Sequence, residues 1–204
     1  MTSKVIVIGV NHDSAPVAVR ERVAFAPEVV PEAISDLISS TQLEEGVILS
    51  TCNRTEIYGW YSQDEQGVAA GADIVTWLAK FHGLSSDDLA TCTYRNYGLA
   101  GLTHLVRVAA GLNSMVLGEP QIFGQIKSAF AVAQESGGIG DSLSKLFPEA
   151  FRLAKRVRTD TAIGENPVSV AYAAVDLAGR IFSDLGNRTA LLLGAGETIE
   201  LVAR

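Results

Sequence analysis

The chain has 204 residues, of which 48% are hydrophobic and 19% charged, and its formal net charge is −7. This composition excludes a disordered chain and is sufficient for one good core or two small ones. The apolar runs are far shorter than the ~20 residues of a membrane helix, and the N-terminus lacks a signal-peptide pattern, so we expect a cytoplasmic protein with no membrane partner. The negative charge argues against general nucleic-acid affinity and leaves a local basic patch as the remaining route to RNA.

The first third of the chain predicts a strand, two helices and then two further strands. Residues 4–10 predict a buried strand, followed by an exit turn and a helix over 17–23. His12 falls in that turn, where a histidine most often bonds local backbone. A second helix should follow Pro27, with an apolar face made of Val30, Ile34, Leu37 and Ile38.

Cys52 lies between two short runs, 46–49 and 57–61, whose β-branched and aromatic residues predict strands. It would therefore sit in a tight connection on a rigid scaffold. Only the thiolate is a strong nucleophile, and a nearby guanidinium such as Arg54 would favour that anion. The alternative role for Arg54 is to bind a substrate carboxylate, which its planar guanidinium fork suits. The alternative for Cys52 is a buried, inert thiol.

A helix over 66–81 and a fourth strand over 92–97 complete the first half of the chain. The order β, α, β, β, α, β is that of a ferredoxin-like split βαβ unit, an open antiparallel sheet with helices on one face. We therefore expect an α+β fold. Cys92 would be a structural residue inside the fourth strand. The two cysteines have no CxxC spacing and no nearby histidine pair, so we expect reduced thiols and no metal.

The second half begins with a helix over 99–110, in which His104 stands between apolar neighbours and is more often a core or interface residue. Residues 111–122 are too rich in glycine and polar residues for a core element, and a helix should begin at Pro120. A helix from Asp141 to about Thr161 carries a basic face that is either an RNA phosphate site or a solvated helix surface. That face consists of Lys145, Arg152, Lys155, Arg156 and Arg158.

The C-terminal segment predicts a helix capped by Asn166 and Pro167 that runs to Leu185. A strand over 189–193 then leads into a Gly-x-Gly turn and the start of a helix, as a dinucleotide-binding fold begins. The motif is incomplete, because Ile199 stands where the third glycine is expected.

Three segments closely resemble the glutamyl-tRNA reductase family, which opens tetrapyrrole biosynthesis. They are Ser-Thr-Cys-Asn-Arg-Thr-Glu-Ile-Tyr at 50–58, the opening segment 9–25, and the segment 111–127 that contains Leu-Gly-Glu-Pro-Gln-Ile. One departure is Asn113, where many members carry Asp. The resemblance covers the chain nearly end to end but only the first half of the family's architecture, so we expect an N-terminal fragment without most of the NADPH domain and without the dimerisation domain.

The resemblance implies that the Cys52 thiolate attacks the ester of glutamyl-tRNA(Glu), and that NADPH reduces the resulting thioester to glutamate-1-semialdehyde. It implies catalytic roles for Cys52 and His104. The substrate-binding residues that it implies are Thr51, Arg54, Ser114, Glu119 and Gln125. The NADPH phosphate loop would be formed by Gly194, Ala195, Gly196 and Glu197. On residue chemistry alone, Ser114 is a loop hydroxyl and Glu119 a helix N-cap carboxylate.

These inferences divide the chain into a catalytic domain over 1–140, a connecting basic helix over 141–165 and the truncated start of a Rossmann-type NADPH domain over 166–204. The family forms homodimers, and we expect this fragment to be a monomer that performs only the acyl-transfer half-reaction. A downstream aminomutase and regulatory proteins are further candidate partners. Two other classes stay open: a stand-alone cysteine acyltransferase or thioesterase, and a non-catalytic tRNA-binding regulatory module.

Overall fold

A four-stranded antiparallel sheet forms the centre of the computed structural model, which describes residues 4–61, 67–164, 170–194, 199 and 202. Its strands, in the spatial order β2-β3-β1-β4, are β1 (Val5–Asn11), β2 (Glu45–Ser50), β3 (Arg54–Trp60) and β4 (Tyr94–Tyr97). The central strand β1 pairs with β3 from Val5 opposite Trp60 to Asn11 opposite Arg54. The expected order of strands along the chain and the α+β class are therefore confirmed.

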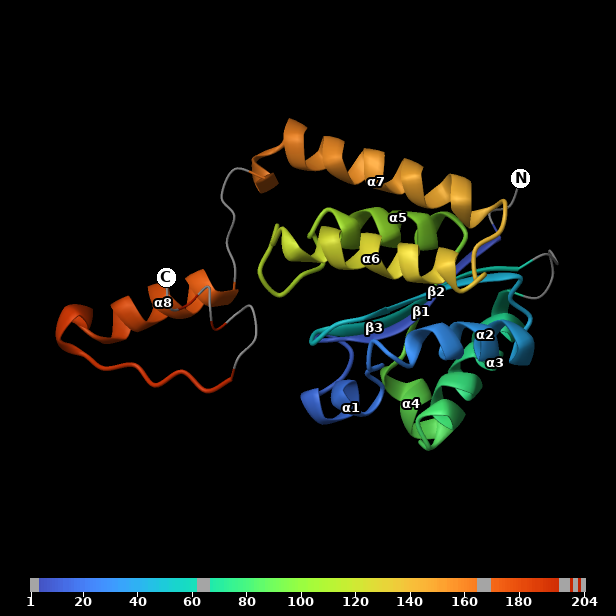
Figure 1. Ribbon diagram of the computed structural model, residues 1–204, viewed down its shortest axis with the longest axis horizontal. Coiled ribbons are helices and arrows are strands. Elements are labelled where there is room, and N and C mark those ends of the chain that lie inside the picture. Colours follow the sequence, from blue (N-terminus) through green and yellow to red (C-terminus); the bar gives the residue numbers. More distant parts are fainter. Residues whose placement is uncertain (1–3, 62–66, 165–169, 195–198, 200–201, 203–204) are drawn as a thin grey trace.

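Helices cover both faces of this sheet (Figure 1). On one side lie α1 (Val17–Arg22), α2 (Val30–Ser40), α3 (Gly67–Phe81) and α4 (Ser86–Cys92). On the other side lie α5 (Leu99–Ala109), α6 (Gln121–Glu135) and α7 (Leu143–Asp160). The expectation of helices on one face only is wrong. All seven residues of β1 are buried, and a strand that is apolar on both faces needs cover on both.

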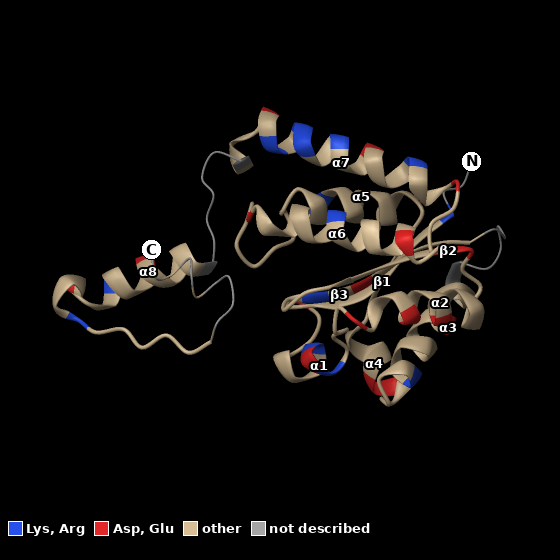
Figure 2. Cartoon of the chain, viewed as in Figure 1, with Lys and Arg blue, Asp and Glu red and all other residues tan. Residues whose placement is uncertain are grey.

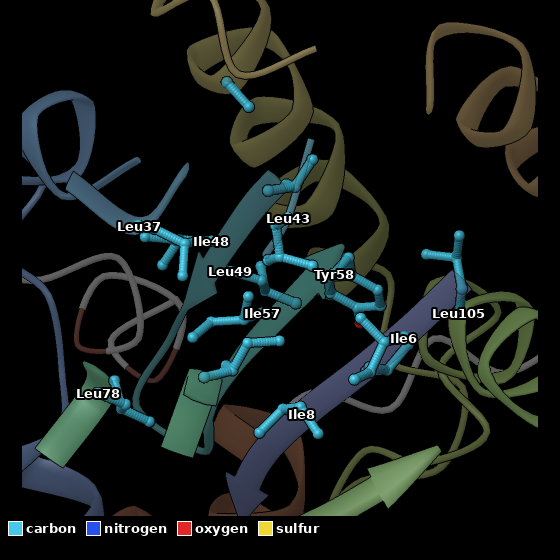
Figure 3. Packing of buried hydrophobic residues seen from close by; sticks show 14 of the residues in the cluster. Ile6, Ile8, Leu37, Leu43, Ile48, Leu49, Ile57, Tyr58, Leu78 and Leu105 are labelled. Atoms are coloured by element: carbon cyan, nitrogen blue, oxygen red, sulfur yellow. The ribbon is translucent and has the colours of Figure 1, made fainter. Parts of the chain in front are cut away.

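The core follows from this two-sided cover. Figure 3 shows Leu37 of α2 beside Ile48 of β2, in a cluster that also contains Ile8 and Ile57. On the opposite face, Tyr58 of β3 meets Phe147 of α7 edge to face, with ring centroids 5.8 Å apart. The sheet is thereby held between two helical layers, and its loops emerge from a rigid support.

Glu45, at the start of β2, binds the N-terminus of α7. Its carboxylate accepts hydrogen bonds from the backbone N–H groups of Gly140 (2.8 Å), Ser142 (2.9 Å) and Leu143 (2.8 Å). The first N–H groups of a helix have no partner within the helix, and an anion at this position also favours the helix dipole. A carboxylate of the sheet thus fixes where α7 begins.

Cys92 does not lie in a strand, which corrects the sequence-based prediction. It ends α4, whose N-cap Ser85 accepts a hydrogen bond from the backbone N–H of Asp88. A serine cap followed by acidic residues in the first turn favours a short helix over an extended strand. The fourth strand therefore begins at Tyr94 and not at Cys92.

The C-terminal segment contains α8 (Val170–Ile181) and a 3-10 turn over Leu185–Asn187. Asn166 and Pro167, predicted to cap this helix, lie outside the described residues. The strand predicted over 189–193 is not formed, since residues 189–194 have no regular structure and Leu191 is 82% exposed. A strand needs a neighbour for its backbone N–H and C=O groups, and no described strand runs beside this segment. None of the described helices is both long and apolar enough to cross a membrane.

Candidate active site

Cys52 lies in the short connection between β2 and β3, as predicted, and its side chain is exposed. Thr51 organises this turn: its Oγ1 accepts hydrogen bonds from the N–H groups of Asn53 and Arg54, both at 3.2 Å. The Thr51 N–H donates to the Arg54 carbonyl at 2.8 Å. The alternative of a buried, inert thiol is therefore wrong, and the thiol projects from a turn with fixed backbone geometry.

A guanidinium does hold the Cys52 turn, and it belongs to Arg20 of α1. Its Nη1 donates to the Cys52 carbonyl at 2.9 Å and to Asn53 Oδ1 at 3.2 Å, and its Nε donates to the Ala15 carbonyl at 3.3 Å. The cation predicted beside Cys52 was Arg54, and this assignment is corrected to Arg20. Little in the sequence indicated Arg20, which is one of two basic residues in the last turn of α1.

Arg54 is the first residue of β3, and its side chain is almost completely buried. Nη1 forms an ion pair with Glu56 Oε1 at 2.8 Å, and Nη2 donates to the Asn113 carbonyl. Burial would lower the pKa of Arg54, but the charge of Glu56 outweighs it and raises that pKa. Arg54 therefore remains a cation and is already bound on two sides.

Glu56 is the centre of a buried polar network that the sequence analysis missed. Its fully buried carboxylate accepts hydrogen bonds from the hydroxyls of Tyr58 and Tyr94, in addition to the contact with Arg54. Burial acts to raise the pKa of Glu56, but the His104 hydrogen bond and the Arg54 charge together lower it to about 2. The carboxylate is consequently ionised at every physiological pH.

Two features of the sequence could have revealed this carboxylate. Arg54, Glu56 and Tyr58 recur at every second position, which is the spacing of one strand face, although the strand was predicted only from residue 57 and β3 begins at Arg54. Gly9 lies opposite Glu56 in the β1–β3 register, and a Cβ at Gly9 would lie 2.7 Å from Glu56 Cγ. The glycine thus leaves room for the carboxylate.

His104 of α5 belongs to this network. Its Nε2 lies 2.8 Å from Glu56 Oε1, and its ring centroid lies 5.2 Å from that of Tyr94. Because an ionised carboxylate only accepts hydrogen bonds, this contact assigns the Nε2 hydrogen to His104. Among the described residues, His104 has no hydrogen bond to Cys52; its partner is Glu56, which also binds Arg54.

The loop between α5 and α6, residues 110–120, closes on itself and is held by arginines. Gly111 and Gly118 have φ angles of +80° and +81°, which favour glycine, and the Gly118 N–H donates to the Gly111 carbonyl at 2.9 Å. Arg107 Nε donates to Asn113 Oδ1 at 3.0 Å. The amide oxygen of Asn113 thus supplies the acceptor at the position where the family often carries Asp.

Arg158, predicted to lie on the basic face of α7, instead binds both ends of this loop. Its half-buried Nη1 donates to the carbonyls of Ala110 (3.2 Å) and Gly118 (3.1 Å). The rest of that face is exposed, and Figure 2 shows its Lys and Arg residues along α7. Arg152 and Arg156 form ion pairs along the helix with Glu149 (2.8 Å) and Asp160 (3.6 Å), which reduces the free positive charge.

Ser114 and Glu119 lie in this loop beside His12, a buried histidine with one ring nitrogen that has no partner in the described part of the chain. His12 Nδ1 is buried and has no hydrogen-bond partner among the described residues, whereas the buried Ser114 Oγ faces the Glu119 carboxyl and lowers its pKa. Burial raises the pKa of Glu119, against the opposing effects of Arg54, Ser114 and His12. Pro120, and not Glu119, is the N-cap of α6, without a side-chain hydrogen bond, so the N-cap interpretation of Glu119 is wrong. Buried polar atoms are nearly always paired, and this cluster therefore indicates a place for a polar ligand.

Gln125 lies apart from the buried network. It lines a groove of about 530 Å³ beside β2, together with Ser50 and Pro120. The predicted residues thus fall into four groups: the turn of Thr51 and Cys52, the network of Arg54 and His104, the loop of Ser114 and Glu119, and the groove.

The predicted NADPH loop is represented by Gly194 alone, which has a φ of +127°. Ala195, Gly196 and Glu197 lie outside the described residues. A pyrophosphate site of this kind needs a strand that ends at the loop, and residues 189–194 form none. With one residue of the predicted loop among those that the structure describes, the NADPH site stays a prediction.

The comparisons with known proteins agree on one family. Residues 8–161 match the family model described as the N-terminal domain of glutamyl-tRNAGlu reductase. Glutamyl-tRNA reductases from Marinomonas sp. (strain MWYL1) and Pseudomonas aeruginosa are 55% and 56% identical over 199 residues, which is 98% of this chain and 46% of each relative. The solved structure of glutamyl-tRNA reductase from Methanopyrus kandleri has a TM-score of 0.69 and 34% identity, and the match covers 100% of this chain and 46% of that one. The chain thus spans about half the length of these relatives.

Proposed function

The chain belongs to the glutamyl-tRNA reductase family, and from this premise we propose that its Cys52 thiolate accepts the glutamyl group of glutamyl-tRNA(Glu) as a thioester. The observation that carries the proposal is the exposed thiol, which projects from a turn held by Arg20 next to β3. A nucleophile on a rigid scaffold loses little freedom when the substrate binds, which favours attack.

The chemistry of this step is an acyl transfer without oxidation or reduction. The Cys52 thiol loses its proton, and the sulfur forms a bond to the ester carbonyl carbon. The bond between that carbon and the ribose oxygen then breaks, and the oxygen leaves with the tRNA and takes up a proton. The products are a glutamyl thioester on Cys52 and a tRNA with a free terminal hydroxyl.

The surrounding residues support separate roles in this reaction. We assign substrate contact to Ser114 and Glu119, because burial raises the pKa of the Glu119 carboxyl and because the buried His12 Nδ1 beside it has no partner among the described residues. Arg54 is buried and paired with Glu56, but its charge also acts on Glu119, and on that ground we assign it to the substrate carboxylate. Thr51 shapes the turn of the nucleophile. We assign to His104, which is bound to Glu56, the role of orienting the network or of transferring a proton.

For a protein with a complete cofactor domain, we propose reduction of the thioester to glutamate-1-semialdehyde by NADPH, in tetrapyrrole biosynthesis, within a homodimer. We propose three parts for this chain: a catalytic domain over 1–140, a basic connection over 141–165 and the start of a Rossmann-type domain over 166–204. The strand order β2-β3-β1-β4 supports a ferredoxin-like arrangement of the catalytic domain. Hydride transfer lies outside what the described residues perform, so this chain is expected to carry out the acyl transfer only.

The test is deacylation of glutamyl-tRNA(Glu) without NADPH, followed by mass spectrometry of the protein. Wild type should carry a glutamyl adduct on Cys52 and release free glutamate slowly as the thioester hydrolyses. Cys52→Ser should show neither, because an alkoxide forms far less readily than a thiolate at neutral pH. Equal deacylation by Cys52→Ser would refute the proposal. A Cys52→Ala variant that binds labelled tRNA, combined with an inactive wild type, would favour the non-catalytic tRNA-binding module.

A further inference from the structure

We propose that the groove beside β2 binds the 3′-terminal nucleoside of the tRNA, the leaving group of the acyl transfer; this inference rests on the proposed function. The groove, called the β2 groove below, has a volume of about 530 Å³, which is in the range of small-molecule sites. Its walls come from the segment before α2 and from α6, and residues 48–50 of β2 form its floor.

The β2 groove opens next to the nucleophile. Ser50 on its floor precedes Cys52 by two residues, and since consecutive Cα atoms are 3.8 Å apart, their Cα atoms lie within about 8 Å. Pro120 on its wall directly follows Glu119 of the polar cluster. The ribose oxygen of the ester is one bond from the attacked carbon, so the nucleoside must occupy a space that begins beside Cys52.

A second cavity, of about 500 Å³, lies beside His104 and Arg107 and is the competing location. It also contains Asn96 of β4, and β4 and β2 form opposite edges of the sheet. Because Cys52 directly follows β2, the nucleophile is nearer in the fold to the β2 groove. A nucleoside attached to the reacting ester therefore reaches the β2 groove more directly than the cavity at the β4 edge.

The lining suits an uncharged nucleoside. The exposed rings of Pro27 and Pro120 provide flat apolar surface for a base, and the largely buried Phe25 adds the apolar wall behind them. The amides of Gln121 and Gln125 both donate and accept hydrogen bonds, as the edges of a base require. No charged side chain lines the groove within the described part of the chain, so it is not built for a phosphate.

Phe25 is held in place from behind. Its ring lies 6.2 Å from that of Trp77 in a stacked arrangement and 5.2 Å from that of Phe81. Its backbone N–H donates to Ser50 Oγ at 2.9 Å. The wall of the groove is thus tied to the strand that precedes the nucleophile, and a base held against this wall would be positioned relative to Cys52.

Gly124 gives a direct way to block the groove. It lines the groove on α6, and a Cβ added there would meet no atom within 4 Å. Gly124→Trp should therefore fill the groove without displacing the fold, and loss of a glycine inside a helix also favours the helix. Gln134→Trp is the matched control, because it places the same side chain on an exposed site of α6 outside the groove.

The first experiment measures thioester formation from glutamyl-tRNA(Glu) over a substrate titration. Gly124→Trp should raise KM at least tenfold, while Gln134→Trp matches wild type and circular dichroism shows all three proteins folded. If wild type forms the thioester and Gly124→Trp has an unchanged KM, the β2 groove is not the nucleoside site, although the proposed function stands.

The second experiment does not require the reaction. The trinucleotide CpCpA is titrated into isotope-labelled wild-type protein, and its effect on amide resonances is recorded. Shifts centred on Gly124 and Gln125 support the inference, even if no thioester ever forms and the proposed function fails. Shifts centred on Asn96 and Arg107, or no shifts at millimolar CpCpA, overturn it.

Discussion

Replacing Arg158 by methionine removes the guanidinium that joins α7 to the loop carrying Ser114, while it keeps most of the aliphatic stem. Two hydrogen bonds are lost, to the carbonyls of Ala110 (3.2 Å) and Gly118 (3.1 Å); the approach to the Glu119 carbonyl at 3.5 Å is too long to add much. Hydrogen bonds to charged groups contribute ~1.5–3 kcal/mol each. Water replaces part of that at a half-buried site, so the expected loss is about 2–4 kcal/mol of unfolding free energy.

For a chain of this length, that loss corresponds to a decrease in Tm of roughly 5–15 °C, measured by thermal unfolding monitored by circular dichroism. Arg152→Met is the control, because the Arg152 side chain is 58% exposed and pairs only with Glu149 on the surface. Surface pairs of this kind contribute about 0–1 kcal/mol. The reasoning fails if Arg158→Met is as stable as Arg152→Met and both weaken tRNA binding equally, since Arg158 would then act as a surface cation.

Three further predictions concern the interior. The pKa of Glu56 is lowered on folding from 4.5 to about 2, so the ionised carboxylate stabilises the fold above pH 4.5 and this stabilisation is lost as pH falls toward 2. Urea unfolding should show a loss of about 3 kcal/mol of unfolding free energy over this range, and Glu56→Gln should abolish that loss. Burial lowers the pKa of His82 below 6.5, so wild type should lose stability relative to His82→Leu as pH falls from 7 to 5, and parallel pH profiles would count against this. Gly9→Ala should destabilise by about 1–3 kcal/mol, because its Cβ would lie 2.7 Å from both Glu56 Cγ and the Thr55 carbonyl, whereas Gly124→Ala, with open space around it, should not.

Elements with a strong local pattern could be predicted from the sequence. The apolar runs around 5–10, 46–49 and 57–60 became β1, β2 and β3, and the amphipathic periodicity of α2 placed Leu37 in the core. The helical layer on the second face could not be inferred from an element order alone, because that order is compatible with one covered face or two. The short helix α4 was missed, since its signal was a serine cap and not a periodic pattern.

The site was predicted in part for similar reasons. The position of Cys52 in a connection followed from the two strands around it. The direction of the Arg54 side chain depends on strand pleating, which places it with Glu56 on the face of the sheet that α5 covers. Arg20 holds the Cys52 turn across 32 residues of sequence, and no local pattern encodes such a contact. The cluster of basic residues along 145–158 predicted Arg158 as a surface cation. Its partners are backbone carbonyls 40 and 48 residues away in the sequence, which only the folded chain brings close.

The two ends of α7 are fixed by different parts of the molecule, and this makes its length a constraint. Glu45 fixes Leu143 to the sheet, and Arg158 fixes the last turn to the loop of Ser114. The 15 residues between these two points correspond to about 22 Å of helix, at 1.5 Å per residue. Deleting one turn would move one attachment by about 5.4 Å, so both could not be kept. Exposed positions along α7 should therefore accept almost any helix-forming side chain, while its number of residues is set by the distance that it bridges.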